Sequence, residues 1–133
     1  MITVFDDTQR THAPREFIVS GKPQPIPERP ERIDMLMEGV RRLGGAVVAP
    51  PEIFGDTLAL VHNRRYIQFL STVWERWKRL PDAAETPSAN VFALGRPSLP
   101  PTHYPDSVVG QCGWHLGDGS APITAQTWGS ARA

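Results

Sequence analysis

The prolines of this chain constrain its fold more than any other feature of the sequence. There are 14 of them in 133 residues, and most crowd into two stretches, residues 14–30 and 81–105. Proline cannot donate a backbone hydrogen bond and cannot continue a helix. We therefore predict a long loop over residues 8–29 and a second, proline-rich loop that begins at residue 81.

Apolar patterns beside these loops predict an α/β domain. Residues 2–5 and 46–49 are short, apolar and rich in β-branched side chains, which is typical of strands. Between them, a helix is predicted from Pro30 to the Gly44-Gly45 pair, because apolar residues recur at steps of three and four. A strand, a helix and a second strand in this order favour parallel pairing. The apolar stripe of the helix comprises Ile33, Leu36, Met37, Val40 and Leu43.

A second amphipathic helix is predicted from Asn63, its capping residue, to Leu80. Asp56 is expected to cap a short helix that ends at Val61 just before it. Arginines and lysines, among them Arg76, take the face opposite the apolar stripe. That stripe comprises Tyr66, Ile67, Leu70, Val73, Trp74, Trp77 and Leu80.

The last third of the chain shows no strong periodicity. We predict no regular element over residues 81–123, although the segment is too apolar for a disordered linker and should pack on another part of the domain or on a second chain. Residues 124–133 are interpreted as the start of a helix, capped by Thr124 or Thr127, that is cut short. Residues 1–133 therefore indicate a partial domain, with an opening over 1–80, a proline-rich loop or insertion over 81–123 and a helix start over 124–133.

Charge and cysteine content exclude several classes of function. Acidic and basic residues balance at 14 each, so no general attraction to nucleic acid or to anionic membranes is expected. Trp74 and Trp77 could stack on nucleic acid beside the arginines of the same helix, but they fall on the apolar stripe and are better explained as core. With one cysteine, no apolar run of bilayer length and no signal sequence, a cytoplasmic location is expected.

Metal-binding and nucleophilic side chains are few and scattered. His12, His62, His103 and His115 fit no compact metal signature, so structural or surface roles are favoured. Cys112 has no assigned base, and a small buried hydrophobe is the preferred interpretation over a nucleophile.

Three segments carry a resemblance to a known family. They are PERPERI at 27–33, VHNRRYIQFL at 61–70 with WERW at 74–77, and GQCGWHLGDGSAPITAQTW at 110–128. In this order and at these distances they resemble the N-terminal third of the histone deacetylase superfamily. The tryptophan-bearing helix and the third segment are most similar to acetylpolyamine amidohydrolases. The resemblance covers nearly the whole chain and is weakest over 81–105.

This resemblance implies the N-terminal part of a three-layer α/β/α arginase-deacetylase-like domain with a parallel sheet. It also implies, for the full-length family, a catalytic zinc held by two aspartates and a histidine, and an acetylated polyamine or small acetyl amide as substrate. Those ligands lie downstream of the matched region, and this sequence has no His-His pair and no Asp-x-His. We therefore assign no catalytic residue and no metal ligand, and expect no zinc on this chain.

Some family positions carry over from the resemblance. Arg32 in PERPERI matches an arginine that lines an internal cavity beneath the metal, although a helix-surface charge explains it equally well. Glu16 lies in the loop where polyamine-specific members place an acid at the channel mouth, but ungapped matching puts Phe17 there. Carboxylates suit this position because a polyamine is a cation.

Near Gly110 the family carries a second acidic residue, which holds the substrate. This chain has Val109 at that position, so Asp106 and Asp118 are the remaining acidic candidates. The alternative for each of them is an acidic loop residue without a role in substrate binding. Tyr104 is a further candidate for the channel mouth. The 81–105 stretch matches an insertion that packs across a dimer in this branch, so a homodimer through it is expected.

Three hypotheses follow. The chain is a piece of a zinc-dependent deacetylase and is inactive alone, or it is a non-catalytic interaction or dimerisation module. The third hypothesis, a nucleic-acid binder, is disfavoured by the zero net charge.

Overall fold

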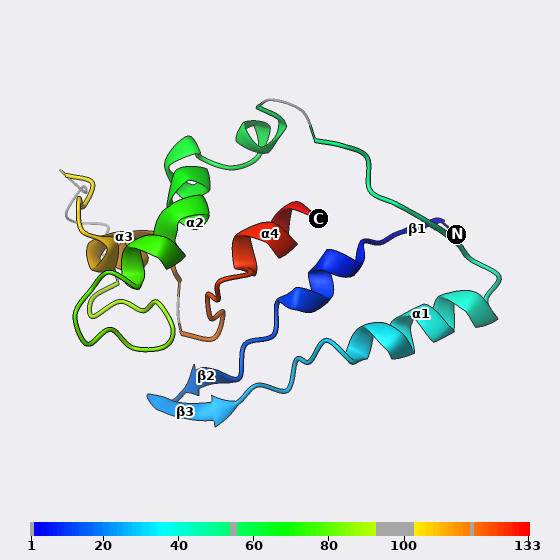
Figure 1. Cartoon of the computed structure of the whole chain (residues 1–133), viewed down its shortest axis with the longest axis horizontal. Coiled ribbons are helices and arrows are strands. Elements are labelled where there is room, and N and C mark those ends of the chain that lie inside the picture. The colour runs from blue at the N-terminus through cyan, green and yellow to red at the C-terminus, as the bar shows by residue number, and fades with distance from the viewer. Residues whose placement is uncertain (1, 54–55, 93–102, 118) are drawn as a thin grey trace.

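Helices and short strands of this computed structural model form an open arrangement rather than a single closed layer structure (Figure 1). The structure describes residues 2–53, 56–92, 103–117 and 119–133. Its elements are β1 (Ile2–Val4), β2 (Glu16–Val19), β3 (Lys22–Pro25), α1 (Arg32–Arg42), β4 (Ala46–Val48), α2 (Arg64–Trp77), α3 (Val108–His115) and α4 (Thr127–Arg132), with 3-10 turns at Asp7–Thr11 and Thr57–Leu60.

The predicted strand, helix and strand unit is confirmed. β1 and β4 pair in parallel, with Ile2 opposite Ala46 and Val4 opposite Val48, and α1 lies in the connection between them, after the β2–β3 hairpin. Gly44 ends α1 in the left-handed region at φ 64°, and the amide of Gly45 donates to the carbonyl of Val40 at 2.9 Å. This is the arrangement in which glycine closes a helix at least conformational cost. The α/β class with a parallel sheet is therefore correct.

The prediction of a structureless loop over residues 8–29 is wrong. β2 and β3 form an antiparallel hairpin, joined by Ser20 at φ 50° and Gly21 at φ 75°. Two consecutive positive φ values suit a two-residue hairpin turn. Pro23 and Pro25 lie in β3, and proline is tolerated there because the sheet has two strands and both are edges.

The prediction of no regular element over residues 81–123 is also wrong, because α3 lies within it. Ser107 begins this helix, and its hydroxyl accepts a hydrogen bond from the amide of Gly110 at 3.1 Å. α3 carries two glycines, which disfavour a helix in isolation. Its packing explains one of them, since a Cβ on Gly113 would lie 1.9 Å from the carbonyl oxygen of Val91. Tertiary contact rather than propensity therefore holds this helix.

The core lies between α2 and α3. Its buried residues are Phe69, Val73, Trp77, Val108, Cys112 and Ile123. The buried line on α2 runs through Phe69, which the predicted stripe omits, then Val73 and Trp77. The indole of Trp77 donates to the carbonyl of Ala84 at 2.8 Å, which fixes the chain after α2. Burial of Cys112 confirms its interpretation as a small core residue.

A polar bridge fastens α2 to the segment that precedes α3. The guanidinium of Arg76, predicted on the solvent face, donates to the side-chain oxygen of Gln111 and to the carbonyl of Asp106, the latter at 2.8 Å. The amide group of Gln111 in turn donates to the carbonyl of Pro105 at 2.8 Å. These bonds satisfy Gln111, which is almost fully buried.

The observed helix-capping residues agree with the predicted ones only in part. The side chain of Asn63 caps α2 by accepting from the amide of Arg65 at 2.8 Å, as predicted. Asp56 makes no capping bond; it forms a bidentate pair with Arg64, and that guanidinium lowers the pKa of the Asp56 carboxyl. Gln126, not a threonine, precedes α4. Within the part of the chain that the structure describes, no helix is long and apolar enough to cross a membrane.

Candidate functional site

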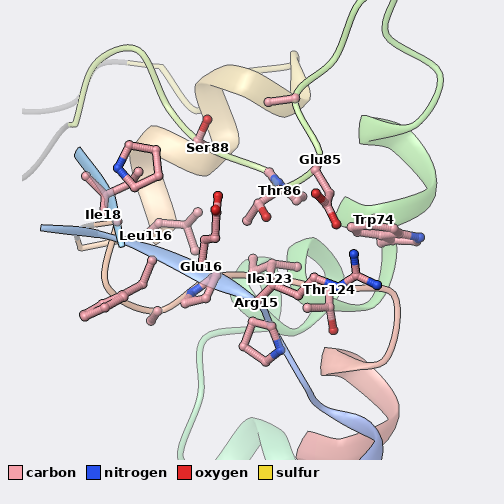
Figure 2. A pocket seen from close by; sticks show the side chains of 18 of the residues that line it. Arg15, Glu16, Ile18, Trp74, Glu85, Thr86, Ser88, Leu116, Ile123 and Thr124 are labelled. Carbon is pink, nitrogen blue, oxygen red and sulfur yellow. The ribbon is translucent and has the colours of Figure 1, made fainter. Parts of the chain in front are cut away.

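A cavity of about 440 Å³ lies between the β2–β3 hairpin and two segments from the second half of the chain. Residues 13–18 form one wall, residues 84–89 another, and residues 121–126 a third, with Trp74 of α2 between them (Figure 2). The backbone links two of these walls, because the amide of Ile18 donates to the carbonyl of Gly119 at 3.1 Å. Cavities of this volume accommodate small ligands.

Two carboxylates line this otherwise largely apolar cavity. Glu16 comes from β2, and its side chain points into the space between the hairpin and the opposite segment (Figure 2). Glu85 lines the cavity from the segment after α2, near Trp74. Carboxylates beside an aromatic ring suit a cation. Arg15 also lines the cavity, so the site presents both signs of charge.

A second group of side chains surrounds His115 at the end of α3. The His115 ring stacks on Phe69 with centroids 4.7 Å apart, and its Nε2 lies 2.8 Å from the hydroxyl of Tyr104. The guanidinium of Arg65 lies 4.9 Å over the Tyr104 ring, and the ring of Trp114 meets the same ring edge-on. Burial raises the pKa of Tyr104 and lowers the pKa of His115.

This burial of His115 predicts a loss of stability on mild acidification. The unfolded chain takes up a proton on His115 near its ordinary pKa of 6.5, whereas the folded chain takes it up only at lower pH. Stability is therefore full above about pH 7 and falls as the pH drops through 6.5 towards the folded pKa. Burial also lowers the pKa of His12, which acts in the same direction.

The measurement is the urea midpoint of unfolding at pH 7.5 and at pH 5.5. His115→Gln keeps a polar group beside Tyr104 but does not titrate, so the difference between the two midpoints should shrink in this variant. An unchanged difference would show that His115 does not contribute to the pH dependence.

The candidate residues do not gather at one place among the described residues. Glu16 lines the cavity, whereas Tyr104 lies against His115, and the side chain of Asp106 is exposed with His103 3.8 Å away. Arg32 begins α1, is half exposed and pairs with Glu28.

Nothing in these contacts tests the predicted internal-cavity role of Arg32, which stays a prediction. Asp118 lies outside the described residues, as do residues 93–102 of the predicted insertion.

The residues that the structure describes do not fit a zinc ion. Over residues 2–53, 56–92, 103–117 and 119–133, no group of three or more histidine, cysteine, aspartate or glutamate side chains converges to hold a metal. His12 contacts the Thr127 hydroxyl at 3.2 Å, and the His62 ring lies 5.6 Å from the ring of Tyr66. A catalytic zinc requires three protein ligands on one ion.

Sequence reasoning missed Glu85, Trp74 and His115 as parts of these sites. The first two meet Glu16 only through contacts between distant segments, which no local pattern reports. The rings of Tyr66 and Phe69, three residues apart on α2, both lie against His115, but this contact also joins distant segments and has no local signal.

Comparisons with known proteins find relatives that share one name, acetylpolyamine amidohydrolase. No family model matches the chain. It is 32% identical over 131 residues to acetylpolyamine amidohydrolase 2 of Pseudomonas aeruginosa, covering 96% of this chain and 36% of that protein. It is likewise 32% identical over 132 residues to the acetylpolyamine amidohydrolase of Burkholderia pseudomallei, covering 98% of this chain and 37% of that protein. The chain thus spans a little over a third of the length of these relatives.

A solved structure agrees with the sequence comparison. The crystal structure of acetylpolyamine aminohydrolase from Burkholderia pseudomallei superposes with a TM-score of 0.86 at 33% identity. The superposition covers 99% of this chain and 37% of that one. Nearly every residue here therefore has a structural counterpart in a larger protein.

Proposed function

Because this chain belongs to the acetylpolyamine amidohydrolase family, as a segment of its deacetylase fold, we propose that the full-length form hydrolyses acetylated polyamines or similar small acetyl amides. The observation that carries the proposal is the match over nearly the whole chain to relatives that bear this name. The chain supplies one part of the fold, the walls of the Glu16 cavity included. Its single cysteine cannot form an internal disulfide, which favours the reducing cytoplasm as its location.

Recognition of a cationic substrate is the contribution we propose for this segment. Glu16 lines a largely apolar cavity and is exposed there, so its carboxylate is open to a charge-assisted hydrogen bond with an ammonium group. Tyr104, Asp106 and Asp118 are proposed as further substrate-channel residues, and Arg32 as a residue of an internal cavity. A family zinc would polarise the acetyl carbonyl and activate water, and residues outside this chain would have to hold it.

We expect no amide hydrolysis by the isolated chain. Its sequence has neither a His-His pair nor an Asp-x-His, and among its described residues no group of three or more histidine, cysteine, aspartate or glutamate side chains could hold a metal. The measurement is acetate release from an acetylated diamine by purified chain, with and without added Zn²⁺. The complete Burkholderia pseudomallei enzyme is the positive control. Zinc-dependent turnover by the pure chain would contradict the expectation.

A non-catalytic interaction module is the second candidate. Val91 is 71% exposed and Phe92 38% exposed, and both lie in the segment predicted to pack across a dimer. We propose that this segment forms a homodimer contact in that case. Light scattering on the purified chain tests this candidate, because a well-folded and strictly monomeric chain would remove it.

A further inference from the structure

The net charge of the cavity that Glu16 lines depends on Glu85. Among the described residues, its charged lining consists of Arg15, Glu16 and Glu85, so that two carboxylates face one guanidinium and the cavity is net negative. If Glu85 were neutral, the charges of Arg15 and Glu16 would cancel, and the lining as a whole would no longer favour a cation. Glu85 therefore gives the cavity its preference for positively charged ligands.

Both carboxylates of this cavity are available to a ligand. Within the part of the chain that the structure describes, no arginine, lysine or histidine forms a salt bridge with Glu16 or Glu85. A second cavity, of about 420 Å³ beside α2 and α4, shows the opposite arrangement. There Arg64 forms a bidentate pair with Asp56, and Arg132 leaves the lining net positive. Of the two cavities, only the first suits a cation.

Separate backbone contacts hold the two carboxylates on different walls of the cavity. Glu16 lies in β2, and a backbone hydrogen bond of 3.1 Å joins this strand to Gly119. Glu85 follows Ala84, whose carbonyl accepts a hydrogen bond from the indole of Trp77 at 2.8 Å. A ligand that binds to groups already held in place loses less affinity to the ordering of the site. The two carboxylates are thus two fixed points for positive charge.

The surroundings of the carboxylates suit an alkyl chain with ammonium groups. Figure 2 shows Trp74 beside Glu85, and the indole is half-buried in the lining. A carboxylate and an aromatic ring together attract an ammonium group. The same cavity is lined by the apolar side chains of Ile18, Leu116 and Ile123, which favour contact with methylene groups. Its chemistry matches a linear aliphatic amine with more than one charged nitrogen.

We propose that this cavity binds a linear aliphatic diammonium group, with one ammonium at Glu85 and Trp74 and the other at Glu16. That this group is the amine part of a substrate rests on the proposed function. An acetylated triamine keeps two ammonium groups, whereas an acetylated diamine keeps one. Glu85 is then a specificity-determining residue that favours the acetylated triamine.

Isothermal titration calorimetry of the complete chain tests the proposal with two probes, 1,4-diaminobutane and butylamine, at equal ionic strength. Both have the same alkyl chain, and they differ in one ammonium group. The diamine should bind about three- to tenfold more tightly, because its second ammonium gains a partly exposed carboxylate as a partner. Glu85→Gln and Glu16→Gln should each remove most of this difference. Arg15→Gln should tighten binding of the diamine, because it removes the positive charge from the lining.

Glu75→Gln is the matched control. Glu75 is exposed on α2 next to Trp74 in the sequence, and it is not among the residues that line the cavity. This variant makes the same change of charge and should bind both amines as the parent chain does. Glu16 and Glu85 are also exposed, so the variants should keep the fold, and unchanged circular dichroism spectra check this.

Several outcomes would overturn the proposal. Absence of diamine binding would do so, as would equal affinity for the diamine and the monoamine. Equal weakening by Glu85→Gln and Glu75→Gln would mean a general attraction of ammonium ions to acidic side chains, and the cavity site would be wrong.

The proposed function fails or holds independently of this result, because neither probe carries an acetyl group. Acetate release by the full-length form tests that function. Binding of the diamine that depends on Glu85, without hydrolysis of acetyl amides by the full-length form, would keep the cavity site and remove the deacetylase assignment. Hydrolysis without diamine binding would keep the assignment and remove the site.

Discussion

Replacement of Phe69 by alanine is expected to lower the free energy of unfolding by about 3–5 kcal/mol. Phe69 is 1% exposed, and its ring stacks on His115, so its loss leaves a cavity between α2 and α3. The neighbours that define this cavity are the only large buried cluster of the described residues. The described residues outside this cluster contribute little buried apolar contact that could compensate for the loss of the ring. Urea unfolding followed by tryptophan fluorescence measures the change, because Trp77 lies in the same core.

Leu60→Ala provides the control for this experiment. Leu60 is 84% exposed in the 3-10 turn before α2, so its truncation should change the stability by less than about 0.5 kcal/mol. If the Phe69→Ala variant is already unfolded without urea, the loss exceeds the stability of the parent chain, which agrees with the expectation. A Phe69→Ala variant within 1 kcal/mol of the parent would contradict it.

Elements with strong local signals could be predicted from the sequence. The unit of β1, α1 and β4 follows from short β-branched runs on either side of a helix that ends at paired glycines. Asn63 indicates the beginning of α2, because an asparagine side chain can accept a hydrogen bond from a backbone amide of the first helical turn that has no partner within the helix. The resemblance to the family also rests on such local patterns, since the three matching segments include the beginning of each of the two long helices.

Elements held by distant contacts could not be predicted. The hairpin of β2 and β3 carries prolines that argue against a strand, and its one local signal is the Ser20-Gly21 pair. α3 has two glycines and no clear apolar stripe, and it forms because Val91 and the core pack against it. Proline and glycine content therefore misled the prediction wherever tertiary contacts decide the structure.

The residues of the candidate site show the same difference between those that the sequence predicts and those that distant contacts bring together. The family resemblance predicts Glu16 as a channel residue, and its side chain lies in the wall of a cavity. Glu85 lies 69 residues further along the chain and lines the same cavity, and the hydrogen bond from the Trp77 indole to the carbonyl of Ala84 holds its segment against α2. Tyr104 and His115 come together only because α3 exists, so their contact was hidden with that helix.

Replacement of Gly113 by alanine should be strongly destabilising, because the added Cβ would make the shortest contact of those found at the described glycines. The new Cβ would lie 1.9 Å from the carbonyl oxygen of Val91 and 3.1 Å from its carbonyl carbon. Both atoms are backbone, so no side-chain rotation relieves the contact. Either α3 or the Val91 segment must move away from the core. We expect a loss of stability at or above the upper end of the ~1–3 kcal/mol typical of overpacking.

Gly39→Ala is the matched control for this substitution. Gly39 lies inside α1, where an added Cβ meets nothing within 4 Å. Alanine is the better helix former, so this variant should gain about 0.5–1 kcal/mol. Glycine to alanine is thus expected to raise the stability when it is made in α1 and to lower it when it is made in α3. The melting temperatures of the two variants measure this difference. Equal stability of Gly113→Ala and the parent would mean that α3 does not pack against the Val91 segment, and the core between α2 and α3 would then need a different explanation.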